Sequence, residues 1–225
     1  MTLTRKLLNV YERLLRCHGP QHWWPADGRF EVMVGAVLTQ SAAWANVRKA
    51  VSNLKAAGAL SPEPIRSLRQ EDLAQLVYPS GYFNSKARKL KALADFLGRR
   101  FDDDLDSMAA EETNALRAEL LDVYGIGEET ADDILLYAVA KPIFVIDAYT
   151  RRVFSRLGLA PDKGSYSAYQ SLFMDNLDRD VELFKEFHAL IVRHGKVVCR
   201  KVPLCEGCCL LDICPTGESS VGPSA

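Results

Sequence analysis

The residues with the clearest capacity for chemistry are five cysteines near the C-terminal end of the chain: Cys199, Cys205, Cys208, Cys209 and Cys214. Four of them follow the spacing Cys199-x5-Cys205-x2-Cys208-x5-Cys214. Four thiolates at this density could enclose a tetrahedral zinc ion or an iron–sulfur cubane, since both take four sulfur ligands. Zinc sites usually pair two CxxC-like knuckles, and only the middle pair is that close here, which favours the cubane. Cys209 could replace Cys208 in this set, but we prefer Cys208 and expect Cys209 to be a buried thiol.

A second segment of interest is "LDVYGIGEETADDILL", residues 121–136. Gly125 and Gly127 permit a tight turn between two helices, Ile126 can anchor that turn in the core, and Thr130 is expected to cap the second helix. N–H groups exposed at the start of a helix can bind a phosphate oxygen without reading base sequence. As a lone motif, however, a Gly-x-Gly turn is more often an ordinary connection between helices.

The third candidate is Asp147, in "PIFVIDAYTRRVFSRLG". This carboxylate follows a short apolar run that looks β-like and stands where the next helix is expected to begin. Asp is among the best N-cap residues, and most such residues only cap. A carboxylate at the mouth of an apolar groove also suits the stabilisation of a cationic centre.

The elements that must position these residues are predicted to be helices. Helical periodicity separated by Gly, Pro and Ser breakers is present over residues 3–17, 29–39, 44–57, 70–77, 84–100, 107–123, 130–140, 148–157, 166–175 and 180–194. Only residues 142–146 have a β-like pattern, and this run is too short and isolated to found a sheet. The fold class is therefore predicted to be all-α.

The composition is that of a water-soluble globular protein, with 225 residues, 48% hydrophobic and 25% charged. The net charge of −1 means that any contact with nucleic acid must rest on a local basic face. No apolar run is long enough to span a bilayer, and the N-terminal segment lacks the pattern of a signal peptide. We expect an intracellular, nucleoid-associated monomer without a membrane partner.

Taken together, "GIGEETA", "VIDAYTRRVFSRLG", "RHGKVVC" and the cysteine spacing resemble the endonuclease III superfamily of DNA glycosylases. "SGYFNSKARKLKAL" (80–93) is also similar to the segment of that family that enters the DNA stack. The first gap between the cysteines is one residue shorter than the family's usual gap.

The resemblance implies two all-helical lobes with double-stranded DNA across the cleft between them. One lobe is a six-helix barrel at 26–141, which includes the helix–hairpin–helix at 114–140. The other combines 1–25 with 142–225. It implies that Cys199, Cys205, Cys208 and Cys214 hold a [4Fe-4S] cluster, that Gly125 and Gly127 contact DNA, and that Asp147 is the catalytic aspartate.

In bifunctional members of the superfamily, the second residue after the hairpin's second glycine is a lysine that forms a Schiff base. Glu129 occupies that position here, and a carboxylate cannot form an imine. Water is then the expected nucleophile, and the enzyme is expected to be monofunctional. Glutamates in a first turn also suit the helix dipole, which is the whole role we assign to Glu128. For Glu129 we expect a role in catalysis beside Asp147.

The substrate is indicated by "QHWWPADGRFEVMVGAVLTQSAAW" (21–44), which is similar to the type III 3-methyladenine DNA glycosylases of this superfamily. Their pocket holds a flipped base between aromatic faces. The match implies that Trp24 and Pro25 lie on one side of the base and Trp44 on the other. Lys196, in "HGK", is implied to line the pocket or the path of the phosphates. Core packing is the alternative role for the tryptophans.

Gln40 and Tyr82 stand at positions whose counterparts in the family enter the gap left by the flipped base. Unstacking costs a few kcal/mol, and inserted side chains recover part of that cost. Beside Tyr82, a run of basic residues comprises Lys86, Arg88, Lys89 and Lys91. Arg88 and Lys91 would share one helix face and could contact phosphates, although a solvated surface is an equal alternative.

The sequence therefore predicts a base-excision glycosylase that hydrolyses the N-glycosidic bond of alkylated purines such as 3-methyladenine in damaged double-stranded DNA. One alternative is an endonuclease III-like glycosylase and lyase for oxidised pyrimidines. An alternative of another class is a DNA-binding or redox-sensing module without catalysis.

Overall fold

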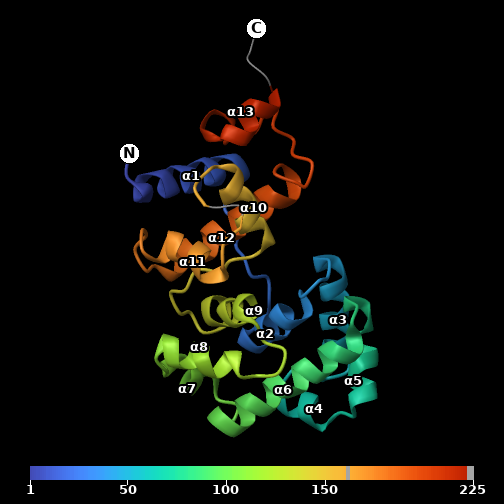
Figure 1. The fold of residues 1–225 in the computed structure, drawn as a ribbon. Helices are drawn as coiled ribbons and strands as arrows, with labels where there is room; N and C mark the ends of the chain where they lie inside the picture. Colours follow the sequence, from blue (N-terminus) through green and yellow to red (C-terminus); the bar gives the residue numbers. More distant parts are fainter. Residues whose placement is uncertain (161–162, 222–225) are drawn as a thin grey trace. The chain divides into compact units, whose positions relative to one another are not determined.

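The computed structural model describes residues 1–160 and 163–221, and every regular element within these ranges is helical (Figure 1). This confirms the all-α prediction. The chain divides into two compact units. We call Trp24–Lys141 the central unit, and Met1–Trp23 together with Pro142–Ala225 the terminal unit.

The central unit is assembled around α2 (Arg29–Leu38), whose side chains are buried from Val32 to Leu38. This helix contacts α3, α6, α9 and the segment η2, and α6 in turn packs against α4 and α5. The remaining bounds are α3 (Trp44–Ala56), α4 (Pro62–Ser67), α5 (Gln70–Leu76), η1 (Tyr78–Ser80), α6 (Phe83–Phe101), α7 (Leu105–Ala110), α8 (Thr113–Leu121), α9 (Glu128–Asp133) and η2 (Ile134–Ala138).

The helix predicted over 107–123 is wrong as a single element, because the chain breaks between α7 and α8. Glu111 is extended, with φ −63° and ψ 156°. The carboxylate of Glu112 then caps α8 by accepting hydrogen bonds from the backbone N–H groups of Asn114 and Ala115, at 3.0 and 2.8 Å. The side chain of Glu112 therefore competes with a continuous helix by satisfying the N–H groups of a new one.

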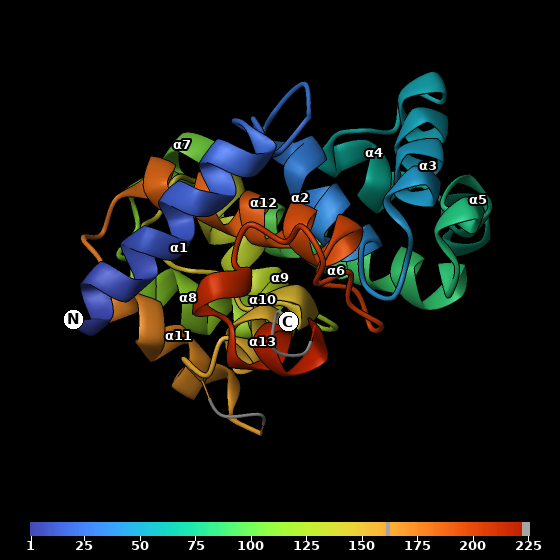
Figure 2. The same cartoon turned by 90° about the horizontal axis from the view of Figure 1, so that it is seen from above.

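The terminal unit is centred on α12 (Val181–Val197), which contacts both α1 (Leu3–His18) and α10 (Ala148–Arg156). Figure 2 shows α1 lying across α12. The other elements are α11 (Tyr166–Met174), η3 (Leu211–Ile213) and α13 (Pro215–Val221). Phenylalanine rings form the core, where Phe144 stacks on Phe173 with ring centroids 3.8 Å apart.

The β-like run at 142–146 is extended, but it pairs with no strand in the described part of the chain. Its polar groups are satisfied by α11 instead. The N–H of Ile146 donates to Tyr166 Oη at 3.2 Å, and the C=O of Phe144 accepts from Gln170 Nε2 at 2.8 Å. This segment leads directly into Asp147 and thereby fixes where α10 begins.

None of the helices in the described ranges combines the length and apolarity needed to cross a bilayer.

Candidate functional site

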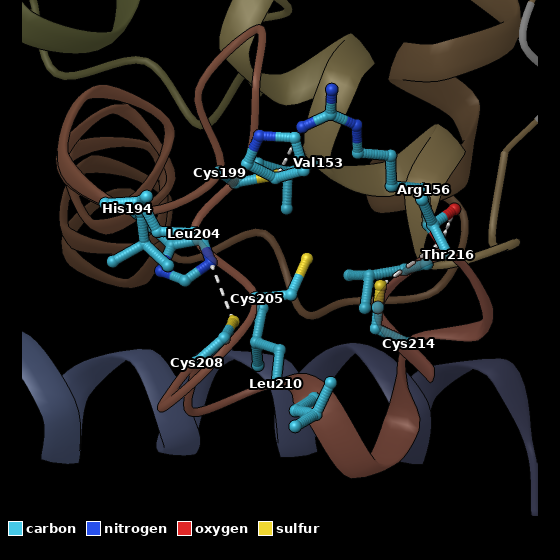
Figure 3. Close-up of a pocket in the computed structure, with 15 residues that line it drawn as sticks. Val153, Arg156, His194, Cys199, Leu204, Cys205, Cys208, Leu210, Cys214 and Thr216 are labelled. Atoms are coloured by element: carbon cyan, nitrogen blue, oxygen red, sulfur yellow. Dashed lines mark hydrogen bonds between the residues drawn. The ribbon is translucent and has the colours of Figure 1, made fainter. Parts of the chain in front are cut away.

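In the terminal unit, four cysteines line one cavity beside the C-terminal end of α12. Cys199 follows α12, Cys205 and Cys208 lie on the loop after it, and Cys214 precedes α13. The cavity has an empty volume of about 390 Å³, which includes space open to solvent, and Val153, Leu157 and Leu210 contribute to its apolar wall. Figure 3 shows the four cysteine side chains spaced around this cavity. Cys209 does not line it.

The spacing of the sulfur atoms distinguishes between the two metal centres that the sequence left open. A single zinc ion binds thiolates at about 2.3 Å and so holds the sulfurs about 3.8 Å from one another. Among the described residues, no three of these four cysteines have sulfurs within 4.8 Å of one another. Four cysteines spread around an apolar cavity fit the larger iron–sulfur cubane better than one zinc ion.

Polar groups of α10 and α12 approach these sulfurs. The guanidinium of Arg156 donates to Cys199 Sγ at 3.3 Å, and His194 Nε2 lies 3.7 Å from Cys208 Sγ. Hydrogen bonding from Cys209 and from His194 lowers the pKa of Cys208, whereas burial raises the pKa of Cys214. Hydrogen bonds to sulfur are among the factors that set the potential of an iron–sulfur centre.

Asp147 caps α10, as its position in the sequence indicated. Its Oδ1 accepts from the backbone N–H of Thr150 at 2.7 Å, and the residue is only 9% exposed. The other oxygen, Oδ2, lies 3.9 Å from Nε2 of His188. Burial lowers the pKa of His188 although Asp147 acts in the opposite direction, so the imidazole is neutral at physiological pH. The cap therefore orients the carboxylate through Oδ1, and Oδ2 faces His188.

Lys196 lies in the same unit, on α12. Its ammonium is 5.6 Å from the ring centroid of Trp23 and 5.7 Å from that of Tyr149. Desolvation lowers the pKa of Lys196, although the residue as a whole remains accessible, while the negative charge of Asp147 raises it. Asp147 and Lys196 are therefore electrostatically coupled. Trp23 and Tyr149, for which the sequence analysis predicted no role, lie against the lysine.

In the central unit, Trp24, Pro25 and Trp44 line one pocket, which has an empty volume of about 620 Å³. The rings of Trp24 and Trp44 touch edge to face, with centroids 5.5 Å apart and planes at 81°. Trp24 also lies against Gly35 of α2, where an added Cβ would be 3.1 Å from the indole. Arg48 and Lys55 bring positive charge to the same pocket. The arrangement offers indole surface, but not two parallel faces with a gap between them.

The hairpin of the central unit runs from α8 to α9. Gly125 has φ +81°, and an added Cβ there would lie 2.4 Å from the side chain of Lys89. Gly127 has an extended φ of −100°, and an added Cβ would meet nothing within 4 Å. The turn therefore requires glycine at 125 but not at 127. At 127, glycine leaves open space in front of the first N–H groups of α9.

Thr130 does not cap α9, which corrects the prediction. The N-cap position is Gly127, and Thr130 is a buried residue inside the helix. Its hydroxyl accepts a hydrogen bond from Gln40 Nε2 at 2.9 Å, and the same amide donates to the C=O of Gly125 at 3.1 Å. Lys89 Nζ donates to the oxygen of Gln40. Gln40 therefore joins the end of α2 to the hairpin and to α6.

Glu128 and Glu129 both lie in the first turn of α9 and are exposed. Glu128 has an ion-pair partner in Arg117, with 3.9 Å between the charged atoms. Glu129 belongs to the central unit and Asp147 to the terminal unit. The carboxylates at the start of α9 face its positive dipole, as expected.

Tyr82 is 75% exposed and has a left-handed backbone, with φ +46°. Beside Tyr82, the three lysines of the basic run make hydrogen bonds within the protein, so neither of the two alternatives, phosphate contacts or a solvated surface, describes the whole run. Lys86 is 2% exposed and donates to the carbonyls of Leu38 and Ser80, and Lys91 donates to that of Arg66. Only Arg88 is exposed, and it lies over the ring of Tyr124 at 5.5 Å.

An all-helical chain with a helix–hairpin–helix and a C-terminal cysteine loop has the features of a class of DNA repair proteins. Residues 34–179 match the family described as "HhH-GPD superfamily base excision DNA repair protein". This chain belongs to that superfamily.

Individual relatives agree with this assignment. A protein of Methanocaldococcus jannaschii, provisionally named a DNA repair glycosylase, is 43% identical over 92% of this chain and 95% of its own. Endonuclease III of Sulfolobus acidocaldarius is 29% identical over 82% of this chain and 81% of its own.

Two solved structures are also similar. The structure of H. pylori 3-methyladenine DNA glycosylase bound to 1,N6-ethenoadenine has a TM-score of 0.74 and 30% identity, over 87% of this chain and 98% of that one. A non-covalent endonuclease III–DNA complex has a TM-score of 0.84 at 21% identity, over 98% and 99% of the two chains, which is a likeness of fold.

Proposed function

We propose that this protein is a monofunctional DNA glycosylase that flips alkylated purines out of double-stranded DNA and hydrolyses their N-glycosidic bond. The observation that carries the proposal is that Trp24, Pro25 and Trp44 line one pocket of the central unit. The 30% identity to the H. pylori 3-methyladenine glycosylase supports it.

The chemistry of an alkylated purine suits an indole-lined pocket. N-alkylation gives the base a positive charge, and a tryptophan face attracts a desolvated cation by about 2 kcal/mol. The contact between the Trp24 and Trp44 rings means that a base stacks on one exposed indole face, or that the rings part to admit it. A cationic base is also a good leaving group, so the site needs little acid catalysis.

The sugar is the second reacting part of the substrate. As the bond to the base breaks, the sugar acquires the character of an oxocarbenium ion. A fixed carboxylate such as Asp147 can stabilise that charge and orient or deprotonate the attacking water. The cap to Thr150 holds Oδ1, so we assign this role to Oδ2. Glu129, at the position of the family's lysine, offers no amine for a Schiff base and is assigned a supporting carboxylate role.

Contacts with the DNA itself are assigned to the central unit. The N–H groups at the hairpin, between Gly125 and the start of α9, are assigned to a phosphate. Tyr82, which is 75% exposed, is the residue most available to fill the gap left by the base. Gln40 also stands near the hairpin, but three polar partners engage its side chain. It therefore serves first to position the hairpin.

The cofactor that fits the tetracysteine cavity is a [4Fe-4S] cluster held by Cys199, Cys205, Cys208 and Cys214. When bound, such a cluster supplies a rigid cross-link for a loop with little regular structure. Arg156 and His194 would hydrogen-bond its sulfur ligands. The loop carries Arg200 and Lys201, which are exposed cations suited to phosphate contacts.

The deciding experiment measures free bases released from methylated DNA, with Trp44→Phe and Trp44→Ala as a matched pair. We expect the wild type to release methylated purines without a borohydride-trapped protein–DNA adduct. Trp44→Phe should keep most of the activity, because it keeps an aromatic face. Trp44→Ala should lose about 30-fold, equivalent to about 2 kcal/mol.

Other outcomes would identify the rivals. Release of oxidised pyrimidines with a trapped adduct would indicate an endonuclease III-type glycosylase and lyase. Tight DNA binding without release of any base would indicate a module without catalysis.

A further inference from the structure

A second group of metal-ligating side chains lies in the terminal unit, outside the tetracysteine cavity. It consists of Cys17 and His18, which are the last two residues of α1, and of Cys209 in the cysteine loop. One ligand atom from each of the three lies within 4.8 Å of the other two. No other such group is present among the residues that the structure describes. The sulfurs of Cys17 and Cys209 therefore lie within 4.8 Å of each other.

Two contacts hold these ligands in place. Arg13, one turn before Cys17 on α1, donates to the backbone C=O of Cys209 at 3.2 Å. The same guanidinium is bidentate to Asp212, at 2.6 and 2.9 Å, so it fixes the loop segment that carries Cys209. The ring of His18 is oriented by a hydrogen bond between its Nε2 and His194 Nδ1, at 3.0 Å. Histidine ligands commonly use one ring nitrogen for the ion and the other for such a bond.

The location separates this group from the tetracysteine site. Cys209 follows Cys208 in sequence, but it does not line the cavity that Cys208 lines. Of these two adjacent residues only Cys208 lines the cavity, whereas Cys209 lies beside Cys17 and His18 of α1. Cys17 is exposed, so an ion can reach the group from solvent.

We infer that Cys17, His18 and Cys209 form a binding site for a thiophilic divalent cation, of which Zn²⁺ is the type, distinct from the tetracysteine centre. Two thiolates and one imidazole are ligands that zinc accepts at 2.0–2.3 Å in a tetrahedral arrangement. Three protein ligands leave the fourth position to water. The hard cations Mg²⁺ and Ca²⁺ prefer oxygen ligands and do not suit this set.

Occupation of the site would tie the C-terminal end of α1 to the cysteine loop. The Arg13–Asp212 ion pair already joins these two segments at the surface, where such a pair contributes little. A metal bridge stabilises more strongly, because the unfolded chain offers no preformed site. The inference does not depend on which base the protein excises.

The test is zinc binding to the purified, iron-loaded protein. Wild type, Cys17→Ser, Cys209→Ser and the control Arg16→Ala, an exposed neighbour on α1, are titrated with Zn²⁺ against a chromophoric chelator under reducing conditions. Iron is quantified in the same samples. We expect one zinc ion per wild-type and Arg16→Ala chain with unchanged iron. Each serine variant should lose at least about 100-fold in zinc affinity and keep its iron.

Four results would overturn the inference. The first is binding of zinc by Cys17→Ser as tightly as by the wild type. The second is binding of zinc only as iron is released, which would place it in the tetracysteine cavity. Loss of iron in Cys209→Ser, but not in Cys17→Ser, would make Cys209 a ligand of the tetracysteine centre. The fourth is a free-thiol count on the metal-free proteins under non-reducing conditions. If the wild type has one free thiol fewer than Cys17→Ser, Cys17 and Cys209 form a disulfide in place of the metal site.

Discussion

Asp147 caps α10, and it is also the carboxylate to which we assign the catalytic role. The cap fixes the side chain through Oδ1, and burial to 9% exposure keeps water from competing for it. Oδ2 remains beside a neutral imidazole, His188. A carboxylate that is oriented before the substrate arrives needs little reorganisation as charge develops on the sugar.

The variant Asp147→Asn tests the proposed catalytic role of Asp147 separately from its role as a helix cap. Asn caps helices about as well as Asp, so we expect an unchanged melting temperature and nearly unchanged DNA binding. The neutral amide cannot stabilise a cation or accept a proton, so base release should fall by on the order of 10³-fold or more. Asp147→Ala should lose stability as well, by about 1 kcal/mol. Base release by Asp147→Asn at the wild-type rate would remove Asp147 from the mechanism.

Glu129→Lys tests why the protein is expected to lack lyase activity. A primary amine at this position supplies the nucleophile that a carboxylate cannot. We expect a borohydride-trapped adduct with DNA containing an abasic site for the variant and none for the wild type. Glu129→Gln is the control, since it removes the charge without adding a nucleophile. Equal trapping by wild type and Glu129→Lys would show that another amine reacts.

For single residues, the sequence predicted those roles that depend only on the neighbouring residues in the chain. Asp147 could be recognised as a cap because its neighbours define where α10 begins. The interactions of Gln40 with Thr130 and of Cys17 with Cys209 could not be predicted. Each joins residues far apart in sequence whose spacing carries no periodic signal. The same reason explains why the sequence could not predict that Lys86 is buried against two carbonyl groups.

Among the elements, the hairpin between α8 and α9 shows that two positions in one motif can carry glycine for different reasons. The backbone at Gly125 is left-handed and is crowded by Lys89, whereas Gly127 is extended with open space around it. Folding therefore explains the first glycine, whereas the backbone does not require the second, for which we propose the approach of a DNA phosphate.

Gly125→Ala and Gly127→Ala should consequently have opposite effects. At Gly125, a side chain at positive φ costs about 1–2 kcal/mol, and the contact with Lys89 adds to that cost. We expect a lower melting temperature for this variant. At Gly127, alanine fits the backbone and should leave stability equal or slightly higher. It should weaken DNA binding, measured by fluorescence anisotropy at fixed salt. If Gly127→Ala binds DNA like the wild type, the hairpin does not contact the phosphate.

Lys86 links α6 to the end of α2 and gives stability a dependence on pH. Burial lowers the pKa of Lys86 to about 8 from its ordinary 10.5, and Lys89 acts in the same direction. Between these two values the unfolded chain binds more protons than the folded one, so the free energy of unfolding rises with pH. Below about pH 8 the lysine is charged in both states and contributes no slope.

Urea unfolding of the wild type and Lys86→Met across this pH range would check that sign. We expect the slope only in the wild type. We also expect a less stable variant at all pH values, because the carbonyls of Leu38 and Ser80 lose their donor. Equal slopes in the two proteins would assign the pH dependence to other groups.

Most long helices were predictable because their apolar residues recur at the helical period over many turns. The six-residue α4, which begins at Pro62, is too short to show that period. The extended run before Asp147 has the composition of a strand, but side chains of α11 satisfy its backbone in place of a neighbouring strand. Local composition cannot reveal which partner a backbone group will find.

For the molecule as a whole, the tetracysteine loop is the part of the terminal unit with the least regular structure, containing only the short η3 between Cys199 and Cys214. Its backbone hydrogen bonds are those of isolated turns and not of a continuous helix, so its order should depend on the metal centre that we propose.

Removal of iron by a chelator should therefore expose this loop before any other part of the protein. In limited proteolysis followed by mass spectrometry, we expect first cleavage between residues 199 and 217, with Trp24–Lys141 intact. The iron-loaded protein should resist cleavage there. Resistance of the iron-free loop would show that Arg13 and Arg156 suffice to hold it.

The terminal unit contains both ends of the chain, whereas the central unit is one uninterrupted segment inserted between them. On the ribosome, the whole of residues 24–141 emerges before α12 does. The first helix, which packs against α12, must therefore wait until the central unit has been synthesised. The tetracysteine centre that we propose cannot form before residue 214 has been added, and a ribosome stalled upstream of α12 would carry the central unit attached to an N-terminal helix that still lacks its partner.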